Sequence, residues 1–271
     1  MAATLFCPGC DFRCPFCHNA SLVVPGREGF PAMDLDEIRA FLEKRRGVLD
    51  GVCITGGEPL LQPDIADFCA ELKDMGFAVK LDTNGSFPAT LEHLVERGLV
   101  DYVAMDVKAA FGMPNVSADE VGPLDKLVGE HGKRLSSNLG EMRGANRNGE
   151  FGESLEASAA ELRFARAIGV APEHAPSLMA AVRESATFLM QGLVPYEFRT
   201  TVVRELHDTA HLRAIASDIR GAQAWYLQGF VDSDGVIGGQ GRFHACSADE
   251  MHAFADDVRA IVPAVQVRGV D

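Results

Sequence analysis

Three cysteines near the start of the chain could ligate a metal centre. Cys10, Cys14 and Cys17 have three residues between the first two thiols and two between the last two. Because an odd number of thiols cannot pair completely, ligation of a soft metal suits them well. Cys-x3-Cys-x2-Cys is the spacing that binds three irons of a cubane [4Fe–4S] cluster and leaves the fourth iron open. An open metal position is where chemistry occurs, as in catalytic zinc sites.

Two other interpretations of these thiols stay open. Cys7 lies three positions before Cys10, so residues 7–10 and 14–17 both read Cys-x2-Cys, a pattern that zinc sites with four cysteine ligands also use. Zinc ribbons usually separate the two pairs by more residues, and Cys7 ends an apolar run typical of a strand, which favours a buried side chain. The thiols could also be unrelated to one another. The cluster is the favoured interpretation.

Other candidate residues follow predicted strands directly. In βα-barrels the catalytic face lies at the carboxyl ends of the strands, so side chains there are candidates for a shared site. Each has a simpler explanation as well: the glycines fit an ordinary turn, and an acid two positions before a lysine fits a salt bridge on the barrel rim. These residues are Gly56, Gly57 and Glu58 after one strand, Asp82 and Thr83 after the next, and Asp106 and Lys108 after the fourth.

The elements that position these residues alternate along the chain. Alternating strands and helices predict a parallel sheet with right-handed crossovers. With the candidate residues at strand ends, we predict an α/β fold, a partial (β/α)6 barrel resembling an incomplete TIM barrel, in one domain over residues 1–271. The strands are expected at about 3–7, 51–55, 78–81, 102–105, 196–203, 224–228 and 265–267, and the main helices at about 35–46, 63–75, 89–97, 176–190, 208–219 and 248–261.

Residues 109–174 interrupt this pattern as a long insertion after the fourth strand. Its centre, 136–153, is rich in Gly, Asn, Ser and charge, which predicts a flexible or disordered segment. The segment could dock a partner, form a lid, or have no function. A second glycine-rich stretch, 231–245, predicts a mobile loop and lacks the spacing of a nucleotide-binding fingerprint.

Composition excludes some classes of partner. The chain has 271 residues, of which 47% are hydrophobic, enough for one large α/β domain or two small ones. With 25 basic and 39 acidic residues the net charge is −14, so we expect neither nucleic acid nor a membrane as partner. Seven cysteines without a signal-peptide pattern favour a cytoplasmic location.

The stretches 10–19 and 56–59, the latter reading Gly-Gly-Glu-Pro, resemble the radical S-adenosylmethionine (SAM) superfamily. Within it the chain is most similar to the activating enzymes of glycyl-radical enzymes, above all the activase of anaerobic ribonucleoside-triphosphate reductase. The resemblance covers about residues 3–110 and 175–270. It implies a barrel open on one side, where a loop of a protein substrate could enter.

The resemblance also implies cofactors and roles. Cys10, Cys14 and Cys17 would hold a [4Fe–4S] cluster, and SAM would chelate its open iron. An electron from a flavodoxin or ferredoxin would cleave SAM to methionine and a 5′-deoxyadenosyl radical, which takes a hydrogen from a glycine of the partner enzyme. The SAM contacts implied are the Gly-Gly-Glu segment for the amino group and Lys108 for the carboxylate. Phe16 is a candidate for the adenine or for core packing alone, Gln228 for the ribose or adenine, and Asn19 for a SAM contact or for ordering the loop. Arg199 is a further candidate contact. Asp82, Thr83 and Asp106 would hold a monovalent cation.

Arg199 has a second explanation, because a charge inside a barrel strand needs a carboxylate or a ligand as partner. An internal ion pair and a contact to SAM are both open. For the whole chain the rival functions are a radical SAM enzyme acting on a small molecule or peptide, such as a deazapurine synthase, a non-catalytic iron–sulfur or zinc module, and a homologue whose insertion blocks the site.

Overall fold

Seven parallel strands form one sheet. The computed structural model describes residues 1–26, 32–112 and 157–270. The strands are neighbours in their order along the chain, and every neighbouring pair is parallel. The predicted α/β partial barrel is therefore confirmed. The strands are β1 (Ala2–Cys7), β2 (Gly51–Gly56), β3 (Ala78–Thr83), β4 (Tyr102–Asp106), β5 (Tyr196–Val202), β6 (Trp225–Gly229) and β7 (Val265–Arg268).

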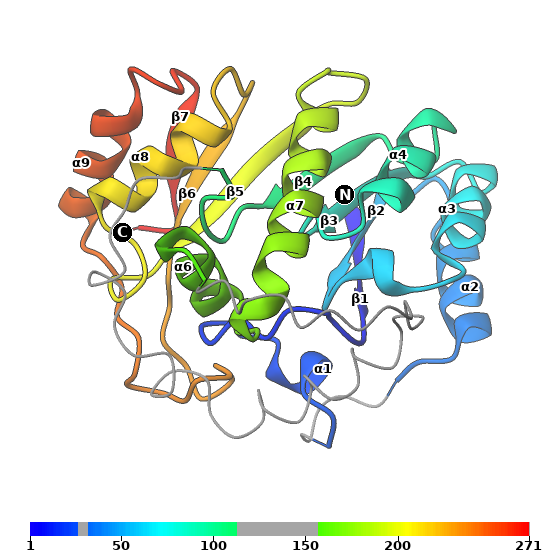
Figure 1. The fold of residues 1–271 in the computed structure, drawn as a ribbon. Helices are drawn as coiled ribbons and strands as arrows, with labels where there is room; N and C mark the ends of the chain where they lie inside the picture. The colour runs from blue at the N-terminus through cyan, green and yellow to red at the C-terminus, as the bar shows by residue number, and fades with distance from the viewer. Residues whose placement is uncertain (27–31, 113–156, 271) are drawn as a thin grey trace, which may run out of the picture.

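The helices lie around the outside of the strands (Figure 1). The six predicted helices begin and end within a few residues of the expected positions, because caps, prolines and glycines mark their ends, whereas α1 (Ala20–Val23) and α6 (Ala159–Ile168) are not among them. The last long helix, for example, begins with a capping box between Ser247 and Glu250. The helices are α1 (Ala20–Val23), α2 (Leu35–Glu43), α3 (Ile65–Asp74), α4 (Pro88–Glu96), α6 (Ala159–Ile168), α7 (Ala175–Leu189), α8 (Thr209–Asp218) and α9 (Ala248–Val258), with short 3₁₀ turns η1 (Pro59–Leu61) and η5 (Pro172–His174).

The two faces of the sheet differ in chemistry. Successive side chains of a strand point to opposite faces. On β5, Phe198, Thr200 and Val202 are fully buried on the face that the helices cover. The other face carries Arg199 and Thr201, and it looks into the barrel. The apolar core thus lies between sheet and helices, while the barrel interior is polar and available for a ligand.

The long insertion is only partly described. Its central segment, 136–153, for which we predicted flexibility, lies outside the described residues, as does everything from 113 to 156. The described end of the insertion contains α6, which begins with a capping box at Ser158 and ends at Gly169 in a left-handed conformation. In the described ranges, no helix has the length and apolar character needed to cross a membrane.

Candidate functional site

The three predicted metal-ligand cysteines share one cavity. Cys10, Cys14 and Cys17 lie in the loop after β1, and their side chains line a cavity of about 260 Å³ at the carboxyl ends of the strands. A hydrogen bond from Cys17 N to Cys14 O, at 3.0 Å, closes a tight turn within the loop. Burial raises the pKa of the Cys14 thiol to about 12 in the metal-free chain, although the charge of Lys108 opposes this. Metal ligation would therefore displace a proton from this thiol.

The Gly-Gly pair lets the end of β2 approach the cysteine loop. A Cβ on Gly57 would lie 1.7 Å from the carbonyl oxygen of Gly9, so no side chain fits there. Gly57 N donates to Cys7 O at 2.8 Å, and Glu58 N donates to Gly9 O at 2.8 Å. These two bonds fix the loop relative to β2. Gly56 and Gly57 both line the cavity.

Glu58 has a different place from the one expected. Its side chain is fully buried and does not line the cavity. The carboxylate accepts hydrogen bonds from Thr83 Oγ1 at 2.7 Å, Asn84 N at 2.7 Å and Leu60 N at 3.1 Å. Burial raises its pKa to about 8, although these donors oppose the shift. Glu58 joins the ends of β2 and β3 beneath the cavity, so its direct role is to position them.

Charged side chains from three neighbouring strands meet at one wall of the cavity. Arg199 on β5 binds Asp82 on β3 at 3.0 Å and Asp106 on β4 at 2.9 Å. Lys108 binds Asp106 at 2.8 Å, and Lys80 binds Asp82. Burial would raise the pKa of Asp106, but the charges of Lys108 and Arg199 lower it to about 2. The ion pairs that we held open for Arg199 and for the Asp106–Lys108 pair are both present.

Phe16, Asn19 and Gln228 complete the predicted set. Phe16 is buried and lines the cavity, with Lys108 Nζ 6.0 Å from its ring centre. Asn19 also lines the cavity, and its side-chain amide donates to Gly56 O at 2.9 Å. Gln228 is paired in register with Thr201, which lines the cavity, but Gln228 itself does not.

Asn84 is a site residue that sequence reasoning missed. An Asn-Gly pair such as Asn84-Gly85 is typical of a turn and by itself indicates no ligand. In the structure Asn84 lines the cavity, donates to the carboxylate of Asp11 at 2.9 Å, and brings its amide nitrogen within 3.7 Å of Cys10 Sγ. It therefore ties the end of β3 to the cysteine loop. Its position directly after Asp82 and Thr83 was the available signal.

His207 is a second residue that we did not predict. It is buried, and its Nδ1 accepts a hydrogen bond from Val203 N at 3.1 Å. That bond assigns the ring proton to Nε2, which lies 3.1 Å from the carbonyl oxygen of Lys108. Burial lowers the pKa of His207 to about 4. The neutral ring therefore holds the backbone of Lys108 and packs edge-on against Phe16 at 6.4 Å.

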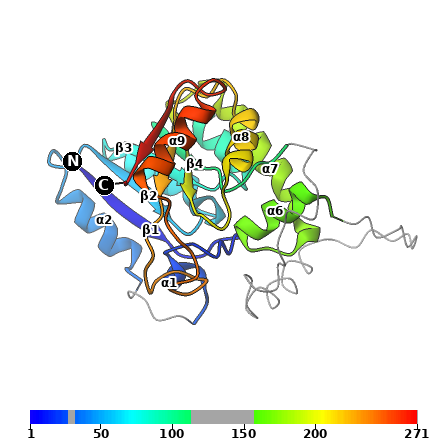
Figure 2. The ribbon, with the colours of Figure 1, turned by 90° about the vertical axis from the view of Figure 1, so that its left-hand side faces the viewer.

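Two distant segments support the cysteine loop. The glycine-rich loop 231–245, expected to be mobile, donates from Gly238 N to Pro15 O at 2.7 Å and from Ile237 N to Cys17 O at 3.0 Å. Helix α6, from the insertion, lies on another side of the same loop (Figure 2). Ile168 O accepts from Arg13 N at 2.7 Å. The end of the insertion is thus part of the site's support, although its residues carried no such signal.

Comparison with known proteins identifies the superfamily. Residues 4–112 match the family model of the Radical SAM superfamily. This segment belongs to the radical SAM superfamily. The chain is 38% identical over 111 residues to a Methanocaldococcus jannaschii protein with the provisional name glycyl-radical enzyme activating enzyme, covering 41% of this chain and 44% of that protein. It is 33% identical over 115 residues to the pyruvate formate-lyase-activating enzyme of Staphylococcus aureus, covering 38% and 45%.

A third relative has a different activity in its name. The 7-carboxy-7-deazaguanine synthase of Methanospirillum hungatei is 37% identical over 83 residues, covering 30% of this chain and 32% of the relative. The chain therefore matches less than half the length of each of these relatives.

Solved structures extend the likeness in fold to nearly the whole chain. SuiB of Streptococcus suis bound to S-adenosylmethionine has a TM-score of 0.59 at 12% identity, covering 99% of this chain and 50% of SuiB. TYW1 with a lysine-pyruvate adduct has a TM-score of 0.50 at 12% identity, covering 94% and 70%. At these identities the likeness is one of fold.

The donor set fits the [4Fe–4S] cluster of radical SAM proteins better than a single zinc ion. The three loop thiols line one shared cavity. Cys7 does not line that cavity, and it lies near Glu58 and Cys69 instead. Phe12 N lies 3.4 Å from Cys10 Sγ, and such amide donors to sulfur are typical of cluster ligands.

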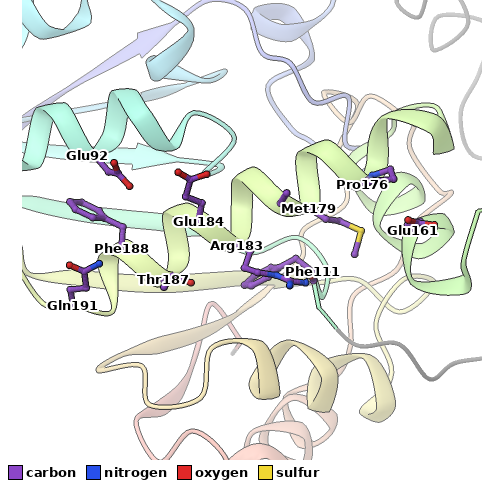
Figure 3. A pocket seen from close by; sticks show the side chains of 11 residues that line it. Glu92, Phe111, Glu161, Pro176, Met179, Arg183, Glu184, Thr187, Phe188 and Gln191 are labelled. Atoms are coloured by element: carbon purple, nitrogen blue, oxygen red, sulfur yellow. Dashed lines mark hydrogen bonds between the residues drawn. The ribbon is translucent and has the colours of Figure 1, made fainter.

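A larger cavity of about 550 Å³ lies outside the barrel along α7, with further lining from α4 and α6 (Figure 3). It contains none of the predicted site residues. Its walls combine the apolar Phe111, Met179 and Phe188 with the carboxylates of Glu92 and Glu184. With no thiol in its lining, it is separate from the radical SAM site.

Proposed function

We propose that this chain is a radical SAM activase that generates a glycyl radical on a partner enzyme, with anaerobic ribonucleoside-triphosphate reductase as the expected partner. The observation that supports it is the cavity after β1, β2, β3 and β4, lined by three thiols, two glycines and one lysine. The two relatives whose names refer to glycyl-radical enzymes or pyruvate formate-lyase point to the same class of activity.

Each part of the cavity has a role in this proposal. Cys10, Cys14 and Cys17 hold a [4Fe–4S] cluster, while the backbone of Gly56–Gly57 and the ammonium of Lys108 bind the amino and carboxylate groups of SAM. The cluster and SAM together supply the reductive cleavage that yields the 5′-deoxyadenosyl radical. Phe16 closes one side of the cavity with an apolar ring. The chain's own contribution is to orient SAM and to keep water away from it.

The open barrel suits a large substrate. β1 and β7 are the two edges of the sheet, and the strand order leaves them unpaired with each other. A loop of a partner protein could reach the polar interior through this opening. A reduced flavodoxin or ferredoxin is the electron donor that goes with this proposal.

Anaerobic reconstitution tests the proposal. We expect the chain to bind iron and sulfide, and after reduction by dithionite to form 5′-deoxyadenosine from SAM. Cys14→Ala, which removes one ligand, should lose both. Addition of the partner reductase should then produce a glycyl radical, visible by electron paramagnetic resonance. A chain that binds zinc and no cluster would refute the cluster assignment, and a loaded chain that never forms 5′-deoxyadenosine, with or without the partner, would refute the activity.

A second candidate is supported by the 7-carboxy-7-deazaguanine synthases among the relatives, such as those of Methanospirillum hungatei and Geobacter sulfurreducens, 37% and 32% identical to this chain over the matched parts. That candidate predicts turnover of a small molecule without any partner protein. Formation of 7-carboxy-7-deazaguanine by the loaded chain alone would favour it over the activase.

A further inference from the structure

The ion pairs at the cavity wall use every carboxylate oxygen of Asp82 and Asp106. Asp82 Oδ2 lies 3.0 Å from Arg199 Nη1, and its Oδ1 binds Lys80 Nζ. Asp106 Oδ1 lies 2.9 Å from Arg199 Nε, and its Oδ2 lies 2.8 Å from Lys108 Nζ. Each of the four oxygens therefore accepts a bond from a cationic group. Charge-assisted bonds of this kind are about twice as strong as neutral ones.

The register of the strands brings these charged side chains next to one another. Arg199 and Asp106 are direct register partners on β5 and β4, and Asp82 pairs with Ala104 two positions earlier on β4. The arginine can therefore reach across β4 to β3. The side chains of Arg199 and Asp82 are both 14% exposed, so solvent screens their interaction weakly. The planar guanidinium holds its donors in a fixed arrangement, so it fixes the geometry of the two carboxylates it bridges more rigidly than a rotating ammonium would.

This arrangement disagrees with the monovalent cation that the resemblance implies. Three positive groups already face two carboxylates, so a further cation would enter a region with excess positive charge. The third expected ligand is engaged elsewhere, because Thr83 Oγ1 donates to Glu58 at 2.7 Å and accepts from Gly85 N at 3.1 Å. The residues present do not fit a cation site.

We propose that the Arg199 guanidinium replaces the monovalent cation in this chain, holding Asp82 and Asp106 at a fixed separation, so that SAM binding requires no added alkali ion. The proposal rests on the proposed function for the identity of the ligand. Arg199 is a positioning residue in it. By binding Asp106 Oδ1, Arg199 leaves Oδ2 to orient Lys108, whose ammonium faces the cavity.

The test compares potassium and sodium with tetramethylammonium at constant ionic strength. Tetramethylammonium is too bulky to enter a site made for an alkali ion. Two quantities are measured on the full chain: the melting temperature without the cluster, and the Kd for SAM after reconstitution, by equilibrium dialysis. We expect both to be the same in all three salts, with Kd changing by less than about twofold.

Arg199→Met removes the guanidinium and keeps an apolar side chain of similar length. Two carboxylates then keep only Lys80 and Lys108 as partners, and we expect potassium or sodium to restore binding by tightening the Kd of this variant about tenfold or more. Arg213→Gln is the matched control, because it breaks an exposed pair with Asp257 far from the cavity. It should behave as the unchanged chain does in every salt.

Three results would overturn the inference. The first is a SAM Kd of the unchanged chain that tightens about tenfold or more in potassium or sodium. The second is a rise in its melting temperature in either salt alone, which would reveal a cation site without any cluster. The third is an Arg199→Met chain that folds and whose Kd for SAM is the same with and without potassium or sodium. The melting temperature needs neither cluster nor SAM. This inference can therefore fail while the proposed function stands, and the proposed function can fail while this inference stands.

Discussion

Glu58→Gln tests whether the buried carboxyl beneath the cavity holds a proton. Burial raises the pKa of Glu58 from 4.5 to about 8 in the folded chain. Between these two values the folded chain therefore holds a proton that the unfolded chain releases. The free energy of unfolding then falls as pH rises, by about 1.4 kcal/mol per pH unit. Glutamine has nearly the shape of the protonated acid and does not titrate, so its variant lacks this dependence.

The measurement is urea unfolding of both chains in the same buffers from about pH 5.5 to about pH 7.5. We expect the stability of the unchanged chain, relative to Glu58→Gln, to fall by about 2 to 3 kcal/mol over this range. Glu184→Gln, the same substitution at an exposed position of α7, is the matched control for the substitution itself. A difference that is flat or rises with pH would refute the reasoning, because it would mean that Thr83, Asn84 and Leu60 keep the carboxylate ionised.

Three further predictions concern the support of the site. His207→Gln removes a ring whose pKa burial lowers from the ordinary 6.5 to about 4. Below about pH 6.5 the unfolded chain binds a proton that the folded chain does not, so the unchanged chain should lose about 1.4 kcal/mol of stability per pH unit relative to this variant. Urea unfolding measures the difference, and a gain in relative stability on acidification would contradict the prediction. Gly57→Ala places a Cβ 1.7 Å from Gly9 O, so we expect the loop to shift and the iron content after reconstitution to drop, whereas a normally loaded variant would contradict the close approach. Phe164→Ala should destabilise the chain by about 3 to 5 kcal/mol. It should also speed the loss of the cluster to a chelator, because the ring centre of Phe164 lies 6.5 Å from that of Phe12 in the cysteine loop. An unchanged rate of cluster loss would show that α6 does not hold the loop.

The strands and the general place of the site followed from local patterns. Apolar runs bounded by glycine located the strands to within one or two residues, as for β2 at Gly51–Gly56 against the predicted 51–55. The rule that ligands meet strand carboxyl ends then brought Cys10, Gly57, Asp82 and Lys108 to a common cavity. Neither step required knowledge of any long-range contact.

The partners of the charged residues could not be predicted in this way. Arg199 is separated from Asp82 by 117 positions, and their pairing depends on the register of β3, β4 and β5. From the sequence alone, a bound ligand and an acidic side chain were equally supported as partners of Arg199. The support from α6 and from Gly238 was missed for the same cause, since backbone carbonyls and amides carry no sequence signal for the loop they will bind.

The backbone bonds of the cysteine loop also bear on how the protein matures. Arg13 N binds Ile168 O, and Pro15 O and Cys17 O bind Gly238 N and Ile237 N. These two supports come from α6 and from the glycine-rich loop 231–245, and both lie after the segment 4–112 that matches the superfamily. The bonds that Gly57, Glu58 and Asn84 make to the loop lie inside that segment. A ribosome therefore delivers one set of supports early in synthesis, whereas the full set requires the chain as far as Gly238.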